Sequence, residues 1–110
     1  MTDDEGPILT QRIGVRYGAA NMSWPFGRID VYPGLFIVDS ARFTLDNVVA
    51  LVRHRGILSD GIRIVHRNPN TAPTTCIFSL NAGRLEAALR QAGFEIVDRL
   101  TDSADAATKR

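Results

Sequence analysis

Residues 28–38 read RIDVYPGLFIV, and this stretch indicates the fold most clearly. Apolar and polar side chains alternate in its first half, which is the two-residue period of a half-buried β-strand. Pro33 and Gly34 suit the central positions of a type II turn, because proline presets φ and glycine accepts a positive φ. An apolar run follows the turn. The sequence therefore predicts a β-hairpin in which residues 26–32 pair with residues 35–39.

Further strand signals lie on both sides of this hairpin. Most are short runs of alternating or β-branched residues bounded by turn-forming residues. The run at 48–52 is also compatible with a helix, but its valines favour a strand. The additional strands are expected at 12–17, 43–45, 48–52, 62–66 and 75–79, with a loop at 68–73.

The hydrophobic period changes after residue 80. Asn81 is a suitable N-cap, because its side chain can accept a hydrogen bond from a free amide of the first helical turn. Gly93 fits the left-handed residue that ends a helix, and Phe94 can fold back on the last turn as in a Schellman motif. The apolar positions at helical spacing are Leu85, Ala88, Leu89 and Ala92. We expect a helix at about 82–92 that packs on the strands as a lid, followed by a short extended piece at 96–97.

Length and composition are those of one ordinary globular domain. The chain has 110 residues, of which 45% are apolar and 23% charged. A chain of this length can bury a core of its own without a cofactor. We expect one domain at 8–100, with mobile ends at 1–7 and 101–110 that lack apolar periodicity.

Charge and cysteine content indicate the kind of partner and the cellular compartment to expect. The net charge of +1 is too balanced to favour nucleic acid by bulk electrostatics. The single cysteine, Cys76, favours a reducing compartment. The N-terminus is acidic where a signal peptide is basic, and no apolar stretch reaches the roughly 20 residues of a membrane span. The expected location is therefore the cytoplasm.

Several pieces of the chain carry a family resemblance. They are SWPFGRI at 23–29, FTLDNV at 43–48, GIRIVH at 61–66 and LEAAL at 85–89. Together with the order of about seven strands before one helix, they resemble the small bacterial pleckstrin-homology-like (PH-like) and GRAM-like domains. The resemblance spans about residues 8–97. It implies a mainly β (α+β) fold of two nearly orthogonal antiparallel sheets, capped by the C-terminal helix. It also implies a scaffold for binding lipid headgroups, peptides or proteins, and not an enzyme.

Arginines are the first candidate site. Arg53 and Arg55 end one expected strand, and Arg63 and Arg67 lie on the next, so a hairpin between the strands would allow the four to converge on an anion. The alternative is an ordinary solvated sheet face. The resemblance also implies that a PH-like domain that binds phosphoinositides has basic residues near the loop between its first two strands. Here this loop, expected near residues 19–22, contains no lysine or arginine, which weakens the case for a lipid headgroup.

The most concentrated bulky segment is the second candidate. Trp24 and Phe26 flank a proline, and Met22 is close by. Tryptophan is enriched at interface hot spots, although filling a corner of the core is the commoner role. An open sheet edge is a further route to a protein partner or to a second copy of the chain.

No pattern in the sequence indicates catalysis or a metal. His54, His66, Asp60 and Cys76 lack the close spacing of zinc ligands. Ser59, His66 and Asp60 have the residue types of a catalytic triad without a surrounding nucleophile motif. The sequence therefore favours a non-enzymatic module that recognises a protein or itself. A binder of anionic ligands is second, and an unrecognised small enzyme third.

Overall fold

The structure is a computed structural model that describes residues 6–98 apart from residues 19, 56–59 and 72–73. The ends expected to be mobile lie almost entirely outside these residues. The described part contains eight strands and one helix: β1 (Leu9–Tyr17), β2 (Ala20–Tyr32), β3 (Leu35–Val38), β4 (Ala41–Thr44), β5 (Val48–Arg55), β6 (Asp60–His66), β7 (Thr74–Ser79), α1 (Ala82–Gln91) and β8 (Ile96–Val97). No helix among the described residues is long and apolar enough to cross a membrane.

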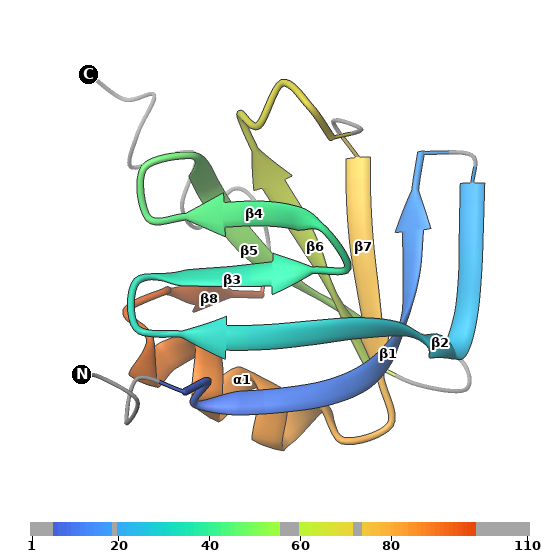
Figure 1. Ribbon diagram of the computed structural model, residues 1–110, viewed down its shortest axis with the longest axis horizontal. Helices are drawn as coiled ribbons and strands as arrows, with labels where there is room; N and C mark the ends of the chain where they lie inside the picture. Colours follow the sequence, from blue (N-terminus) through green and yellow to red (C-terminus); the bar gives the residue numbers. More distant parts are fainter. Residues whose placement is uncertain (1–5, 19, 56–59, 72–73, 99–110) are drawn as a thin grey trace.

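The strands form one strongly curled sheet. Its order is β4-β3-β2-β1-β7-β6-β5-β8, and all neighbours are antiparallel except β5 and β8. The resemblance implied two nearly orthogonal sheets, whereas the strands here form one continuous sheet, because the long strand β2 pairs with β1 and, at its end, with β3. As Figure 1 shows, β2, β3 and β4 run across the direction of β5, β6 and β7. The predicted mainly β class, with a steep crossing of strands, is confirmed.

The hairpin that indicated the fold is confirmed. Tyr32 pairs with Leu35, and Gly34 has a φ of 81°, as the type II turn requires. The run that starts at Val48 is a strand and not a helix. The expected loop at 19–22 is wrong, because β2 already begins at Ala20. The polar residues and the proline in the first half of β2 hide its strand pattern.

The helix has the predicted position and the predicted ending. The amide of Phe94 donates to Leu89 O (3.0 Å) and that of Gly93 to Arg90 O (3.0 Å), which is the Schellman pattern. Asn81 is the N-cap residue, as predicted, but the expected capping hydrogen bond to its side chain is wrong, because the side chain makes none. Its backbone oxygen instead accepts from the Leu85 amide, and its own amide donates to Ser79 Oγ.

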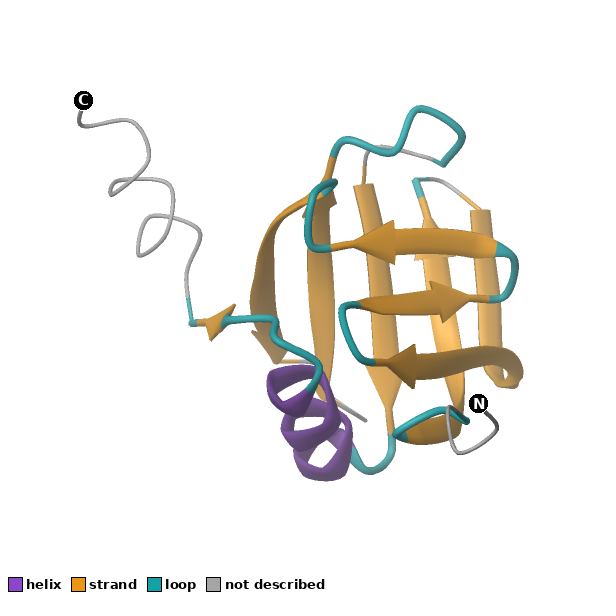
Figure 2. Cartoon of the chain, turned by 60° about the vertical axis from the view of Figure 1, so that its left-hand side comes forward, coloured by secondary structure: helices purple, strands orange, loops and turns teal. Residues whose placement is uncertain are grey.

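The core lies on the concave side of the curled sheet. The largest fully buried side chains are Phe36, Phe43, Ile13, Ile29, Leu51, Ile62, Ile64, Ile77, Leu85 and Leu89. Figure 2 shows α1 lying across one open end of the sheet, where Phe94 meets Phe36 edge-on at 5.0 Å between ring centroids. Because the short helix contributes its apolar side to this core, tertiary packing stabilises it.

Away from the helix, two hydrogen bonds to Asp39 link parts of the chain that are distant in sequence. Tyr17 Oη donates to Asp39 Oδ2 over 2.8 Å, and the amide of Arg28 donates to Asp39 Oδ1. Burial of Tyr17, together with the bond to Asp39, raises the pKa of the phenol above its ordinary value. Asp39 thus ties β1 and β2 to the turn between β3 and β4.

Candidate binding surface

The sheet has an inner face toward the core and an outer face toward solvent. Side chains alternate between the faces along a strand, and residues directly paired across strands share a face. Val15, Ile77 and Ile62 form one inner row and are fully buried. Their neighbours Gly14, Phe78 and Gly61 therefore form an outer row across β1, β7 and β6.

Phe78 lies between two glycines in this outer row. A Cβ at Gly61 would lie 2.7 Å from Phe78 Cδ1, so the ring occupies the space where another residue would have its side chain. The ring of His54 meets Phe78 edge-on at 5.9 Å. On its other flank, a hollow lies between Phe78 and β2, and Gly14 is part of its lining. The missing side chain of Gly14 lets β2 approach closely, because a Cβ there would lie 3.2 Å from the Trp24 amide nitrogen and 3.4 Å from Met22 O.

A large bulge in β2 borders that hollow. Ile13 pairs with Gly27 and Val15 pairs with Met22, so residues 23–26 all lie opposite Gly14. The bulge pushes this segment outward. As a result, the side chain of Trp24 is 50% exposed although it lies inside a strand.

The hollow is a pit of about 330 Å³ on the outer face. Trp24, Phe78 and Leu80 give it apolar walls, and Gly14 is also part of its lining. Its remaining lining comes from Arg16, Asn21, Met22 and Ser23. We call this hollow the outer-face pit. It combines exposed apolar walls with a guanidinium and an amide at one side.

The sequence found part of this surface. Of the predicted interface residues, Trp24 and Met22 line the outer-face pit, but Met22 lies opposite the buried Val15 and packs partly buried against the core. Phe26 is 72% exposed and does not line the pit. Sequence reasoning missed Gly14, Phe78 and Leu80 because they come from other strands. A usable signal was present, since Gly14 and Gly61 interrupt strand patterns, where glycine often marks a bulge or a close approach.

An open strand edge adjoins the pit. β3 pairs with β2 only from Ile29 to Tyr32, while β1 pairs along most of β2. Among the described residues, the segment of β2 from Ala20 to Phe26 therefore has a strand on one side only. Figure 1 shows this segment at the right-hand margin of the molecule. Its unpaired side can accept the backbone of another extended chain.

The structure does not bring the four predicted arginines together. Arg53 lies opposite Ile62 and so on the inner side of the sheet, whereas Arg63 lies opposite Val52 on the outer side. Arg67 follows β6, and its amide donates to Asn47 O. The side chain of Arg55 lies outside the described part of the structure.

Arg63 instead shares the outer face with Arg16. Both lie directly opposite Cys76, one from β6 and one from β1. Burial raises the pKa of the Cys76 thiol, although Arg63 and Arg16 act in the opposite direction. The thiol is therefore neutral at pH 7 and does not act as an activated nucleophile.

Arg53 is engaged in holding the helix to the sheet. Its Nε and Nη2 donate to the two carboxylate oxygens of Glu86 at 2.9 and 2.8 Å, and Nη1 pairs with Asp98. The Glu86 side chain is only 13% exposed. Its hydrogen bonds with Arg53 lower its pKa below the ordinary 4.5. Arg53 therefore has a structural role on the inner side of the sheet.

Replacing this arginine tests that role. We expect Arg53→Met to lower the free energy of unfolding by about 1–3 kcal/mol at pH 7, because it removes both short hydrogen bonds to the largely buried Glu86 carboxylate and leaves only the 3.6 Å ion pair with Arg90. Arg84→Met, at an exposed position of the same helix, is the control and should change it by less than about 0.5 kcal/mol. Urea unfolding measures both.

The same pair predicts a pH dependence. Because the pKa of Glu86 is lower in the folded state, the unfolded state binds the proton more readily. The stabilisation by this pair is therefore present above pH 4.5 and is lost as the pH falls below that value. The difference in stability between the wild-type protein and Arg53→Met should shrink in acid. An equal difference at pH 7 and pH 3 contradicts this role.

The residues considered for catalysis or metal binding are dispersed. Asp60 and His66 lie at opposite ends of β6, about 20 Å apart along an extended strand. Nδ1 of His66 accepts a hydrogen bond from the Asn68 amide, and its ring packs edge-on against Phe43. Ser59 lies outside the described residues. Within the described ranges, no three His, Cys, Asp or Glu side chains gather at a metal-binding distance.

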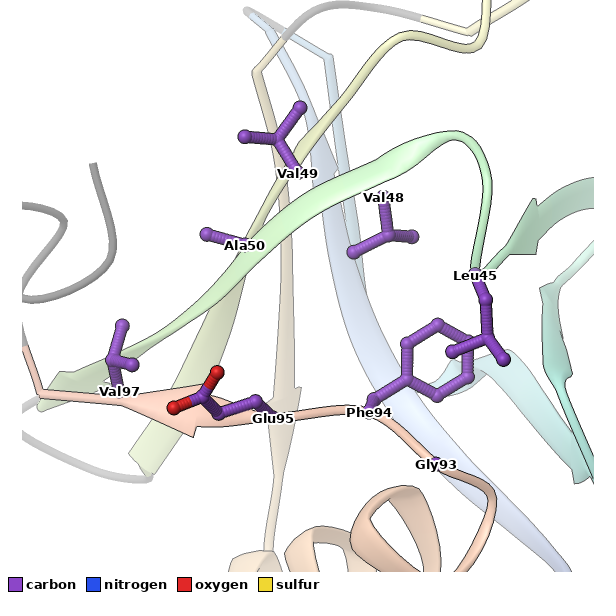
Figure 3. Close-up of a pocket in the computed structure, with 8 residues that line it drawn as sticks. All are labelled: Leu45, Val48, Val49, Ala50, Gly93, Phe94, Glu95 and Val97. Atoms are coloured by element: carbon purple, nitrogen blue, oxygen red, sulfur yellow. The ribbon is translucent and has the colours of Figure 1, made fainter. Parts of the chain in front are cut away.

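A second, smaller cleft lies between β5 and the segment that follows the helix. Figure 3 shows Leu45, Val48 and Phe94 turned toward one another there. The cleft measures about 100 Å³, against about 330 Å³ for the outer-face pit. Phe94 is buried and belongs to the core. We therefore regard this cleft as a gap at the margin of the core, and the outer-face pit as the stronger candidate.

Comparison with known proteins supports the fold. No family model matches the sequence, and neither does any curated protein. Among solved structures, the chain is similar to the Vps36 N-terminal PH domain, with a TM-score of 0.57 and 18% identity over 84% of this chain and 82% of that chain. At this identity the likeness shows the fold alone. The chain therefore has a PH-like fold, as the sequence resemblance implied.

Proposed function

We propose that this protein is a non-catalytic binding module that holds an extended segment of a partner protein on its outer face. The observation that carries the proposal is the outer-face pit, in which the half-exposed Trp24 and the exposed Leu80 face solvent beside an open strand edge. The single cysteine favours a reducing compartment such as the cytoplasm as the place of this activity.

Physical chemistry supports a protein ligand at this place. Tryptophan concentrates binding energy at interfaces because it buries a large, rigid surface at little entropic cost. An extended peptide beside the open edge of β2 gains backbone hydrogen bonds, while a pit provides specificity for one of its side chains. Both features meet at the bulge of residues 23–26.

A displayed library of random decapeptides tests the proposal. We expect the wild-type protein to enrich particular sequences, and Trp24→Ala to bind these at least about tenfold more weakly, a loss of about 1.4 kcal/mol. Leu45→Ala is the matched control, because Leu45 is 52% exposed and lies outside the outer-face pit. The proposal fails if no sequence is enriched, or if Trp24→Ala and Leu45→Ala bind equally well.

Self-association at the same edge is a variant of this function. If the strand segment from Ala20 to Phe26 pairs with that of a second copy, light scattering will give the mass of a dimer. Trp24→Ala will then shift the mass toward that of the monomer. A monomer at all concentrations contradicts self-association and leaves a different chain as the occupant of the edge.

The second hypothesis is an anionic ligand bound by the arginines that the sequence analysis singled out. Arg53 is not available for such a ligand, because it binds Glu86.

A further inference from the structure

We infer that the segment held at the outer-face pit is acidic, with an Asp or Glu two positions from the large apolar residue that enters the pit. This inference rests on the proposed function and adds the chemistry of the partner. It follows from the charges on the outer face and from the spacing of two residues in β1.

Basic side chains dominate the outer face around the pit. Along β1, β5, β6 and β7, the outward positions identified by the strand register include Arg12, Arg16, His54 and Arg63, and no aspartate or glutamate. The outward Asp30 on β2 already binds Arg28 and Thr10. Arg16 and Arg63 are exposed, and neither forms an ion pair within the described part of the chain. An acidic ligand is therefore electrostatically complementary to this face.

Of these basic residues, Arg16 is the one that lines the pit, beside Asn21. Its guanidinium offers a planar set of donors that matches a carboxylate, and Asn21 adds an amide directly opposite on β2. A partner with only apolar side chains would leave these donors facing its surface without acceptors. A carboxylate on the partner satisfies them.

The spacing of the site matches that of an extended peptide. The pit wall Phe78 lies opposite Gly14, and Arg16 is two residues further along β1 on the same face, so Phe78 and Arg16 belong to two successive outward rows. These rows are therefore separated by about 6.6 Å, twice the rise per residue of a strand. Alternate side chains of an extended ligand have the same separation. An apolar residue packed against Phe78 thus places the carboxylate in the row of Arg16 when the acid is two positions away, and not one.

A decapeptide library with a fixed central phenylalanine tests this spacing. The other positions are random, and selection is repeated with Arg16→Gln and with Arg84→Gln, whose arginine is exposed on α1 away from the pit. We expect Asp and Glu to be enriched at two positions from the phenylalanine over one position. We expect the enrichment to disappear with Arg16→Gln and to persist with Arg84→Gln. A selected peptide should lose at least about tenfold in affinity when its acid is changed to asparagine.

The outcomes separate this inference from the proposed function. If peptides bind through Trp24 without an acidic preference at that spacing, the proposed binding function stands and the inference of an acidic partner is overturned. If no peptide binding depends on Trp24, both the proposed function and the acidic partner are overturned. Sedimentation with phosphatidylserine vesicles that is abolished by Arg16→Gln, without any peptide enrichment, assigns the face to a membrane and also overturns the acidic-peptide inference.

Discussion

Gly61→Ala is expected to destabilise the protein by about 3 kcal/mol or more, at the upper end of the range for overpacking. A Cβ at this position would lie 2.5 Å from Ile77 O and 2.7 Å from Phe78 Cδ1. The backbone oxygen cannot move without separating β6 from β7, and the Phe78 ring cannot move without reshaping the outer-face pit. The change therefore affects both the sheet and the candidate site.

Gly83→Ala is the matched control for this substitution. Nothing lies within 4 Å of a Cβ at Gly83, which is inside α1. Alanine there should raise the free energy of unfolding by about 0.5–1 kcal/mol, because it favours the helix. Urea unfolding compares the two variants. Equal stabilities for Gly61→Ala and the wild-type protein contradict the close packing of Phe78 over the β6 backbone.

Phe36→Ala is expected to lower the free energy of unfolding by about 3–5 kcal/mol. Phe36 is fully buried and stacks on Phe43 with ring centroids 5.2 Å apart, while Phe94 meets it edge-on. Removing its ring opens a cavity between the sheet and the segment after the helix. The expected loss is a large part of the whole free energy of unfolding of a domain of this size.

Phe26→Ala removes the same side chain from the surface. Because Phe26 is 72% exposed, its loss should change stability by less than about 0.5 kcal/mol. Thermal or urea unfolding of both variants measures the contrast. Similar losses for Phe26→Ala and Phe36→Ala contradict the assignment of Phe36 to the centre of the core.

Local signals were sufficient to predict several elements. Pro33 and Gly34 identified the hairpin turn, and Gly93 with Phe94 identified the helix end, because each structure depends on the conformational preferences of one or two adjacent residues. The resemblance to PH-like domains correctly indicated the fold class. The curling of the strands into one sheet depends on which strands the long β2 joins, and local sequence does not specify this.

The candidate site was predictable only in part. Trp24 was recognisable as a bulky residue in a short aromatic segment. Its exposure depends on four residues of β2 lying opposite one residue of β1, a register that no local pattern reveals. The arginines do not lie together for a similar reason, which is again the register of the strands. Their faces depend on the pairing of β5 with β6, which puts Arg53 opposite Ile62 and Arg63 opposite Val52.

The most direct test of the proposed binding site uses the fluorescence of Trp24, the only tryptophan in the chain. A selected peptide that enters the outer-face pit covers the half-exposed indole. Its emission should therefore move to shorter wavelengths and saturate at the affinity measured by calorimetry, with Arg16→Gln requiring higher peptide concentrations. Binding detected by calorimetry with no change in the emission of Trp24 would show that the ligand lies elsewhere and contradict the assignment of this site.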